Sequence, residues 1–238
     1  MKSKKITAIG LIEKAHVKGL FFDVDGTLSD SDDLLVERIS RYLRPIAVVS
    51  KSNMHHLLAR LFVMAVETPG NWVYSLVDRL GFDHHFIRVF LKISSRKDVK
   101  RNNHHDKFWI ISGVENMLAA LSANYKLAVV SARDEKSTLE FLEHFGLRKY
   151  FDIVVTSQTR EFTKPFPDPV EFAANYMALH PSECIMIGDT VVDILAGKDA
   201  GTQTVGVLCG FGTKKELQRA GADLIISSTA VITDILMG

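Results

Sequence analysis

Short apolar segments alternate with helix-like segments in the first tenth and in the second half of this chain. Most of the apolar runs are continuous, as expected for strands that are covered on both faces. The runs lie at residues 17–24, 126–131, 151–156, 184–188, 204–208 and 223–227. Amphipathic segments lie between them at residues 114–121, 136–145 and 191–200, and Gly201 follows the last as a left-handed cap. The alternation predicts an α/β fold with a parallel sheet built from strand–helix–strand units.

Residues 31–107 follow a different pattern, in which apolar residues such as Leu35 and Ile39 recur at helical spacing without a clear strand. The stretch carries 13 Lys and Arg against 8 Asp and Glu, whereas the whole chain carries 29 against 28. We therefore expect a helical cap domain at 31–107, inserted into a core domain made of 1–30 and 108–238. Its positive charge fits a lid that meets an anionic substrate, and it equally fits an ordinary solvated helical surface.

Composition excludes several classes of protein. The formal net charge of +1 provides no chain-wide basic field for nucleic acid. Cys184 and Cys209 form neither a disulfide framework nor a zinc site, so a reducing cytoplasm is the expected location. The apolar run at 6–12 is interrupted by Gly10 and is too short for a signal peptide, and no run reaches transmembrane length. We expect a cytoplasmic monomer or homodimer that binds neither nucleic acid nor membrane.

Two carboxylates follow the first apolar run. Asp23 and Asp25 are two residues apart, so strand periodicity places them on one face, and a Gly26-Thr27 turn follows. The carboxyl end of a parallel strand is where open α/β sheets bind ligands. Two close carboxylates repel unless a cation neutralises one of them or they share a proton. The pair by itself could equally be part of a helix cap or a turn.

Three later segments supply complementary groups. Ser131 ends another predicted strand, Lys164 lies in a proline-rich loop, and Asp189 with Asp193 follows a third strand. All of them would meet at one edge of the sheet. A nucleophilic carboxylate, a hydroxyl, an ammonium and further carboxylates are what phosphoryl transfer through an aspartyl-phosphate and a hard divalent cation requires. Taken singly, Ser131 could be a helix N-cap and Lys164 an ordinary loop residue.

These four segments, in this order, resemble the signature motifs of the haloacid dehalogenase superfamily over about residues 19–237. Within it, the chain is most similar to the phosphoglycolate phosphatase and β-phosphoglucomutase group, which inserts a helical cap directly after the first motif. The resemblance implies a Rossmann-like core. It also implies a phosphatase that hydrolyses a small phosphorylated metabolite with Mg²⁺ as its cofactor.

The resemblance assigns roles to the residues that bind and transfer the phosphoryl group. Asp23 would attack phosphorus, and Asp25 would protonate the leaving alkoxide and then activate water. Ser131 would donate a hydrogen bond to a phosphoryl oxygen, helped by backbone amides of the following turn at Ala132. Lys164 would pair with the nucleophile and the phosphoryl group and so reduce charge repulsion.

The resemblance also suggests the residues that hold the metal. Asp23, the backbone carbonyl of Asp25 and Asp189 would bind Mg²⁺, which needs few protein oxygens because it retains water. Asp193 follows Asp189 by about one helical turn. It is expected to orient Lys164 or a metal-bound water rather than to bind the ion directly.

Three other functions use similar groups. A sugar phosphomutase forms the same aspartyl-phosphate but returns the phosphoryl group to a sugar. A non-catalytic phosphate-binding module would need neither the nucleophile Asp23 nor a separate acid at Asp25. A response-regulator receiver shares the acidic pocket, the hydroxyl and the lysine, but has no use for a cap or for the acid at Asp25. We expect phosphate ester hydrolysis, with the sugar phosphomutase and the non-catalytic phosphate-binding module as the alternatives.

Overall fold

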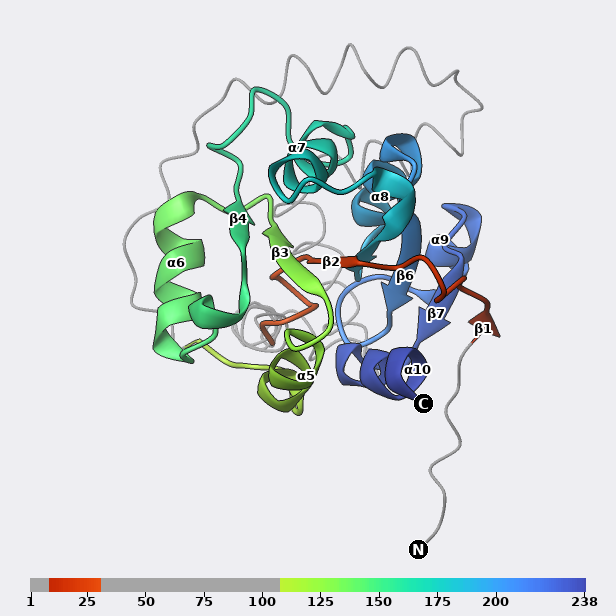
Figure 1. Cartoon of the computed structure of the whole chain (residues 1–238), viewed down its shortest axis with the longest axis horizontal. Helices are drawn as coiled ribbons and strands as arrows, with labels where there is room; N and C mark the ends of the chain where they lie inside the picture. Colours follow the sequence, from red (N-terminus) through yellow and green to blue (C-terminus); the bar gives the residue numbers. More distant parts are fainter. Residues whose placement is uncertain (1–8, 31–107) are drawn as a thin grey trace, which may run out of the picture. The chain divides into compact units, whose positions relative to one another are not determined.

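The computed structural model describes residues 9–30 and 108–238 of the chain, drawn in colour in Figure 1. The two stretches belong to one compact unit. It has the sheet and helices predicted for the core domain. The helical cap expected at 31–107 lies outside the described residues and stays a prediction.

The described residues form a seven-stranded sheet in the order β1-β7-β6-β5-β2-β3-β4, parallel except for the antiparallel β1. The strands are β1 (Ile9–Gly10), β2 (Gly19–Phe22), β3 (Lys126–Val130), β4 (Ile153–Val155), β5 (Cys184–Gly188), β6 (Gln203–Val207) and β7 (Leu224–Ile226). Each of the six apolar runs in the sequence contains or overlaps one of the parallel strands. The predicted parallel sheet is thus confirmed.

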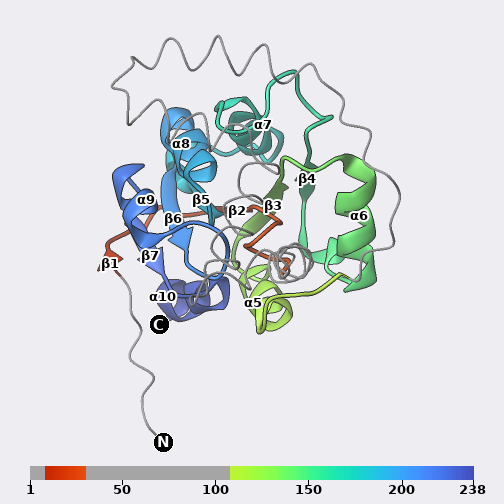
Figure 2. The same ribbon diagram turned by 180° about the vertical axis from the view of Figure 1, so that it is seen from behind.

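Helices cover both faces of the sheet (Figures 1 and 2). The α-helices of the described part are α5 (Val114–Leu121), α6 (Glu135–His144), α7 (Asp168–Tyr176), α8 (Val191–Ala200), α9 (Lys214–Arg219) and α10 (Ile232–Met237). Short 3₁₀ helices are η2 (Arg148–Tyr150), η3 (Pro181–Glu183) and η4 (Thr229–Val231). Side chains of α5, α6 and α10 share one core cluster, and those of α7 and α8 belong to a cluster on the opposite face.

The central strand β2 contributes to both clusters because its side chains alternate between the two faces of the sheet. Leu20 and Phe22 pack in the same cluster as Leu118 of α5, whereas Phe21 packs with Val170 of α7. All three β2 side chains are fully buried. Burial on both faces explains why the sequence of the strand is continuously apolar instead of alternating.

The segment before β2 covers one edge of the sheet. After the β1 pairing with β7, the Leu11 N–H donates to the Asp223 carbonyl at 3.0 Å. The Glu13 N–H donates to Gln203 Oε1 at 2.6 Å, and Gln203 Nε2 donates back to the Glu13 carbonyl at 2.9 Å. An unpaired edge strand can form hydrogen bonds with a strand of another chain, so this segment protects β7 from such pairing.

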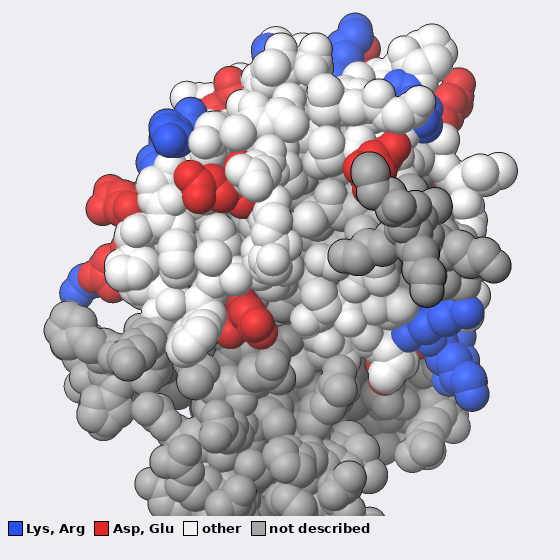
Figure 3. Space-filling model, turned by 90° about the horizontal axis from the view of Figure 1, so that it is seen from below, with Lys and Arg blue, Asp and Glu red and all other residues white. Residues whose placement is uncertain are grey.

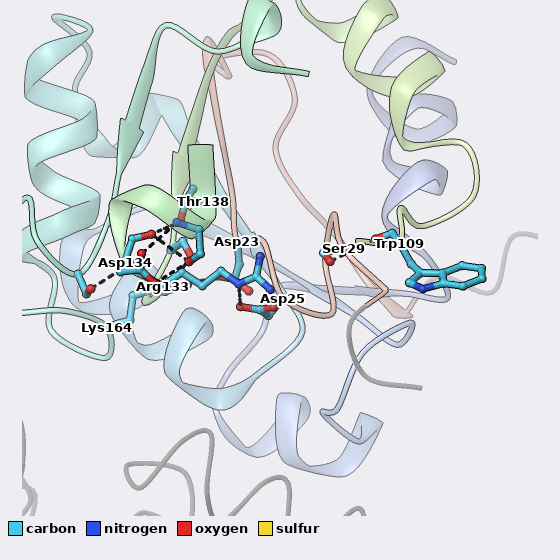
Figure 4. A network of polar contacts seen from close by, with 11 residues as sticks. Asp23, Asp25, Ser29, Trp109, Arg133, Asp134, Thr138 and Lys164 are labelled. Atoms are coloured by element: carbon cyan, nitrogen blue, oxygen red, sulfur yellow. Dashed lines mark hydrogen bonds and ion pairs between the residues drawn. The ribbon is translucent and has the colours of Figure 1, made fainter. Parts of the chain in front are cut away.

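The points where the chain leaves this unit and returns to it lie side by side. The Asp30 N–H donates to the Trp109 carbonyl at 2.9 Å, and the Ile111 N–H donates to the Leu28 carbonyl at 3.0 Å. Ser29 Oγ donates to the same Trp109 carbonyl at 3.2 Å (Figure 4). Because the two ends are joined, an insertion at this position leaves the sheet undisturbed.

The surface of the described part shows no large field of one charge on the face seen in Figure 3, where acidic and basic side chains are interspersed. Large exposed apolar side chains come from separate segments of the described chain: Leu11, Trp109, Tyr176, Leu208 and Met237. Single exposed apolar residues of this kind are normal for a globular protein. Within residues 9–30 and 108–238, no helix has the length and apolar character needed to cross a membrane.

Close packing of α8 against β5 and β6 gives a prediction at Gly197. A Cβ built there would lie 2.7 Å from Thr204 Cγ2 and 2.8 Å from Met186 Cβ. Although Gly→Ala usually stabilises a helix by about 1 kcal/mol, we expect Gly197→Ala to lower the free energy of unfolding by about 1–3 kcal/mol in urea denaturation. Asp199→Ala, an exposed position on the same helix, should change it by less than about 0.5 kcal/mol. A Gly197→Ala protein as stable as the parent would contradict this packing.

Candidate active site

The candidate site lies where three adjacent strands end. Asp23 follows β2, Ser131 follows β3 and Asp189 follows β5, and β2 pairs with both of the other strands. The strand order reverses at this point, since β3 and β4 extend the sheet on one side and β5, β6 and β7 on the other. Ligands of open α/β sheets bind at the carboxyl ends of strands beside such a reversal. The topology therefore brings the predicted residues to one edge, as expected.

A buried ammonium joins two carboxylates at the centre of this edge. Lys164 Nζ donates to Asp23 Oδ1 at 2.5 Å and to Asp193 Oδ1 at 2.6 Å. The exposed fractions of the three side chains are 2% for Lys164, 9% for Asp23 and 1% for Asp193. The other carboxylate oxygen of Asp193 accepts from the Thr190 N–H at 3.0 Å and from Thr190 Oγ1 at 2.7 Å, at the start of α8. Asp193 is thus held in place by the helix terminus and in turn holds Lys164.

Burial and charge shift the pKa values of this network. Burial raises the pKa of Asp23 to about 7, Lys164 opposes the shift, and the carboxylates of Asp193 and Asp25 add to it. For Lys164, burial alone would lower the pKa, but Asp193 and Asp23 outweigh it and hold the pKa above its usual value. Lys164 is therefore a permanent cation within the site at neutral pH.

Asp189 is fully buried in a cradle of main chain. The Phe211 N–H donates to Asp189 Oδ2 at 2.7 Å. Gly26 adopts a left-handed φ of 73°, and a Cβ either there or at Gly210 would collide with the same oxygen. Two glycines are needed because the loop after β6 and the turn after β2 both approach this carboxylate closely.

Asp25 forms an ion pair with Arg133, which is not among the residues predicted for the site. Arg133 Nε lies 2.8 Å from Asp25 Oδ2, and the two side chains are 16% and 34% exposed (Figure 4). Asp25 follows the same strand as Asp23, two residues further on. Hence each carboxylate of the first motif has its own basic partner, Lys164 for Asp23 and Arg133 for Asp25.

Ser131 is buried at the end of β3, and its Oγ accepts from the Arg133 N–H at 3.1 Å. The N-cap of α6 is Asp134, so Ser131 does not cap that helix. Ala132 lies exposed in the turn between them. The helix-cap interpretation of Ser131 is therefore wrong for α6, and its hydroxyl belongs to the site edge.

The acidic residues suit a hard divalent cation. Carboxylate oxygens of Asp23, Asp189 and Asp193 lie within 4.8 Å of one another. Mg²⁺ prefers oxygen ligands of this kind. Both oxygens of Asp193 already accept hydrogen bonds from Lys164 or Thr190, which makes Asp23 and Asp189 the better metal ligands of the three.

Two contributors to the site are not among the residues predicted from the sequence. Arg133 belongs to the segment that contains Ser131, but nothing in its spacing shows that it reaches Asp25. The Phe211 main chain has a detectable signal, because Gly210 and Gly212 on either side of it indicate a close backbone approach. The partner of that approach becomes evident only when β5 and β6 are paired.

The chain is similar to known proteins over most of its length. The family model described as haloacid dehalogenase-like hydrolase matches residues 20–207. A pyrophosphatase of Halalkalibacterium halodurans is 27% identical over 226 residues, which cover 93% of this chain and 97% of the relative. A phosphoglycolate phosphatase of Nitrosococcus oceani is 27% identical over 229 residues, which cover 91% of this chain and 95% of the relative.

The fold also matches solved structures. The crystal structure of a protein described as a predicted phosphoglycolate phosphatase from Haemophilus somnus superposes with a TM-score of 0.65. The match covers 94% of this chain and 99% of that one at 21% sequence identity. At this identity, the likeness concerns the fold alone.

Removal of the central cation should destabilise the protein in a pH-dependent way. Without divalent cations, we expect Lys164→Met to lower the free energy of unfolding by about 3–5 kcal/mol at pH 8, because Asp23 and Asp193 stay buried without their counter-ion. The loss should be smaller at pH 5. Burial already raises the pKa of Asp23 to about 7, and Lys164 opposes this shift. Its removal raises the Asp23 pKa further, so this carboxyl is neutral at pH 5 at little cost in free energy.

A matched variant separates this effect from simple loss of a lysine. Lys198 forms an ion pair with Asp223 in which the side chains are 35% and 29% exposed. Lys198→Met should therefore cost less than about 1 kcal/mol at either pH. Equal losses for the two variants in urea unfolding would contradict the central role of the Lys164 network.

Proposed function

Because this chain belongs to the haloacid dehalogenase-like hydrolases, we propose that it hydrolyses a phosphate ester of a small metabolite through a phosphoenzyme on Asp23. The observation that carries the proposal is the buried ion pair of Lys164 with Asp23 at the carboxyl end of β2. A carboxylate placed beside a permanent cation can approach an anionic phosphoryl group with less repulsion. The phosphatase and pyrophosphatase names of the relatives support hydrolysis.

The reaction proceeds in two steps on the residues of the chain. An Asp23 carboxylate oxygen attacks phosphorus and forms an acyl phosphate, while the bond from phosphorus to the ester oxygen breaks. Asp25 donates its proton to the leaving oxygen. In the second step a water attacks phosphorus, Asp25 accepts a proton from that water, and the Asp23 carboxylate is released together with inorganic phosphate.

The remaining residues bind the phosphoryl group. Ser131 donates its hydroxyl hydrogen to a phosphoryl oxygen, and the Ala132 amide lies in the adjoining turn, where it can donate as well. Lys164 offsets the charge that develops on the equatorial oxygens. Asp193 is a positioning residue for Lys164, since both of its carboxylate oxygens are already committed.

Asp23, the backbone carbonyl of Asp25 and Asp189 are the groups that would hold a divalent cation, for which Mg²⁺ is the proposed species. Bound there, the cation would neutralise the carboxylates and favour the ionised form of Asp23. The Phe211 N–H holds Asp189 Oδ2 in place, and the main chain at Gly210 passes close to the same oxygen.

The proposal also covers the cap, the substrate and the cellular compartment. Residues 31–107 are proposed to form a helical cap that excludes water during phosphoryl transfer. The substrate is a small phosphorylated molecule, and a phosphoglycolate- or pyrophosphate-like compound is the first choice on the strength of the relatives' names. The two free thiols, Cys184 and Cys209, fit a reducing compartment such as the cytoplasm.

Phosphate release from a panel of phosphorylated metabolites, with Mg²⁺ and with a chelator, tests the proposal directly. We expect metal-dependent release by the parent protein and a loss of at least about 10³-fold in kcat for Asp23→Asn, because no acyl phosphate can form. Asp25→Asn should be nearly as damaging, since the leaving oxygen loses its proton donor.

Asp168→Asn serves as the control, because this carboxylate is at the start of α7 and has no role in the proposed reaction. It should retain activity within about threefold of the parent. Release by Asp23→Asn at the parental rate would refute the nucleophile assignment. Isomerised sugar phosphate with little free phosphate would instead identify a phosphomutase.

The two acidic residues after β5 should behave differently. We expect Asp189→Asn to weaken Mg²⁺ binding by at least about tenfold in titration calorimetry, because it removes a proposed ligand. Asp193→Asn should keep the Mg²⁺ dissociation constant within about threefold while lowering kcat, since it loosens Lys164. Equal weakening of Mg²⁺ binding in both variants would show that Asp193 is a ligand too.

A further inference from the structure

The backbone of Arg133 is hydrogen-bonded through both its N–H and its carbonyl. Its N–H donates to Ser131 Oγ at 3.1 Å, and its carbonyl accepts from the Ser157 N–H at 2.9 Å and from Ser157 Oγ at 3.0 Å. Ser131 follows β3 and Ser157 lies just after β4, so the backbone of Arg133 is tied to the ends of two neighbouring strands. The side chain therefore starts from a fixed point at the edge that carries the site.

At least one N–H donor of the Arg133 guanidinium group has no acceptor among the described residues. Nε pairs with Asp25, which uses one of the five N–H groups that an arginine provides. Nη1 is buried and makes no hydrogen bond to any described residue. An arginine stays charged at all accessible pH values, and a buried donor without an acceptor is costly. An anionic oxygen is the group that would satisfy both the charge and this donor.

The neighbouring charged residues do not provide an acceptor for Arg133 Nη1. Asp134 follows Arg133 directly, but its Oδ1 accepts from the Ser137 N–H at 2.9 Å and its Oδ2 from Ser137 Oγ at 2.6 Å, as the cap of α6. Lys164 is surrounded by its two carboxylates. Lys164 retains one N–H, which the proposed function directs to the phosphoryl group, so the buried Nη1 of Arg133 is the donor left for a second anionic group. Figure 4 shows its side chain reaching across from the end of β3 to Asp25.

We propose that Arg133 is a specificity-determining residue that binds a second anionic group, a carboxylate or a phosphate, on the leaving-group side of the substrate. This rests on the proposed function, in which Asp25 gives its proton to the leaving oxygen and thus marks that side of the site. A cation 2.8 Å from Asp25 is then close to whatever the leaving oxygen is attached to. The preferred substrates are phosphate esters or anhydrides whose leaving group is itself charged.

The chemistry of the side chain explains the selectivity. A planar guanidinium can bind a carboxylate or a phosphate through two parallel hydrogen bonds, and a lysine cannot reproduce this geometry. A substrate with a neutral leaving group leaves the buried Nη1 donor unsatisfied. The site should therefore discriminate between two esters that differ only in this second charge.

Binding to the Asp23→Asn protein, in which turnover is blocked, tests the inference by calorimetry with Mg²⁺ present. The probes are 2-phosphoglycolate, pyrophosphate and ethyl phosphate, the last with an uncharged leaving group. We expect at least one of the two probes that carry a second anionic group to bind about tenfold tighter than ethyl phosphate. Which of them does so tells whether the second group is a carboxylate or a phosphate. Adding Arg133→Gln should reduce the preference to below about threefold.

Two further variants on the Asp23→Asn background control the test. Lys136→Gln removes a nearby exposed cation that pairs with Glu140 on α6, and it should leave the preference unchanged. Arg133→Lys retains the charge but not the planar fork, and it should give an intermediate preference. An unaltered preference in Arg133→Gln, or an equal loss in Lys136→Gln, would overturn the inference.

The outcome also separates this inference from the proposed function. Suppose that the parent protein releases phosphate in a metal-dependent way and that the binding preference for a second anionic group is the same with and without Arg133. The proposed phosphatase function would then remain supported, and only the role of Arg133 would be refuted. Absence of phosphate release, together with a preference that depends on Arg133, would refute the hydrolase and leave an anion site at Arg133.

Discussion

The buried contact of Lys164 with Asp23 and Asp193 is the interaction on which the rest of the site depends. Three charged side chains with little exposure to water can coexist only if each is paired, because the cost of desolvating an isolated ion is several kcal/mol. The network joins the end of β2, the loop before α7 and the first turn of α8. Any change that moves one of these elements leaves a charge unpaired, so the network ties the geometry of the site to the stability of the fold.

The parallel sheet makes this network possible. Strand β2 lies between β3 and β5, so residues that follow three separate strands meet at one edge although they are far apart along the chain. The buried side chains of the strands occupy both faces, which leaves the strand ends as the place for polar chemistry. Main-chain groups position Asp189, because the Phe211 N–H donates to its carboxylate. Glycines allow the neighbouring loops to approach this carboxylate closely.

Much of this could be predicted from the sequence, and the failures have physical reasons. The six apolar runs predicted the parallel strands because burial on both faces imposes a continuous apolar pattern that is visible locally. Strand β1 is not predictable from the sequence, because two residues show no periodicity. It is defined by its pairing with β7. The segments of α7, α9 and α10 were not predicted as helices. The last two are only one to two turns long, and α7 begins inside a proline-rich loop.

The class of fold and the chemical groups of the site are encoded locally in the sequence, because buried strands and clustered carboxylates each produce a recognisable pattern. The sequence assigned Asp23, Ser131, Lys164 and Asp189 to one edge through the rule that parallel strands share their carboxyl ends. The pairing of these groups depends on the three-dimensional packing of the chain. Contacts such as Arg133 with Asp25 join residues more than a hundred positions apart, and no local periodicity encodes which donor reaches which carboxylate.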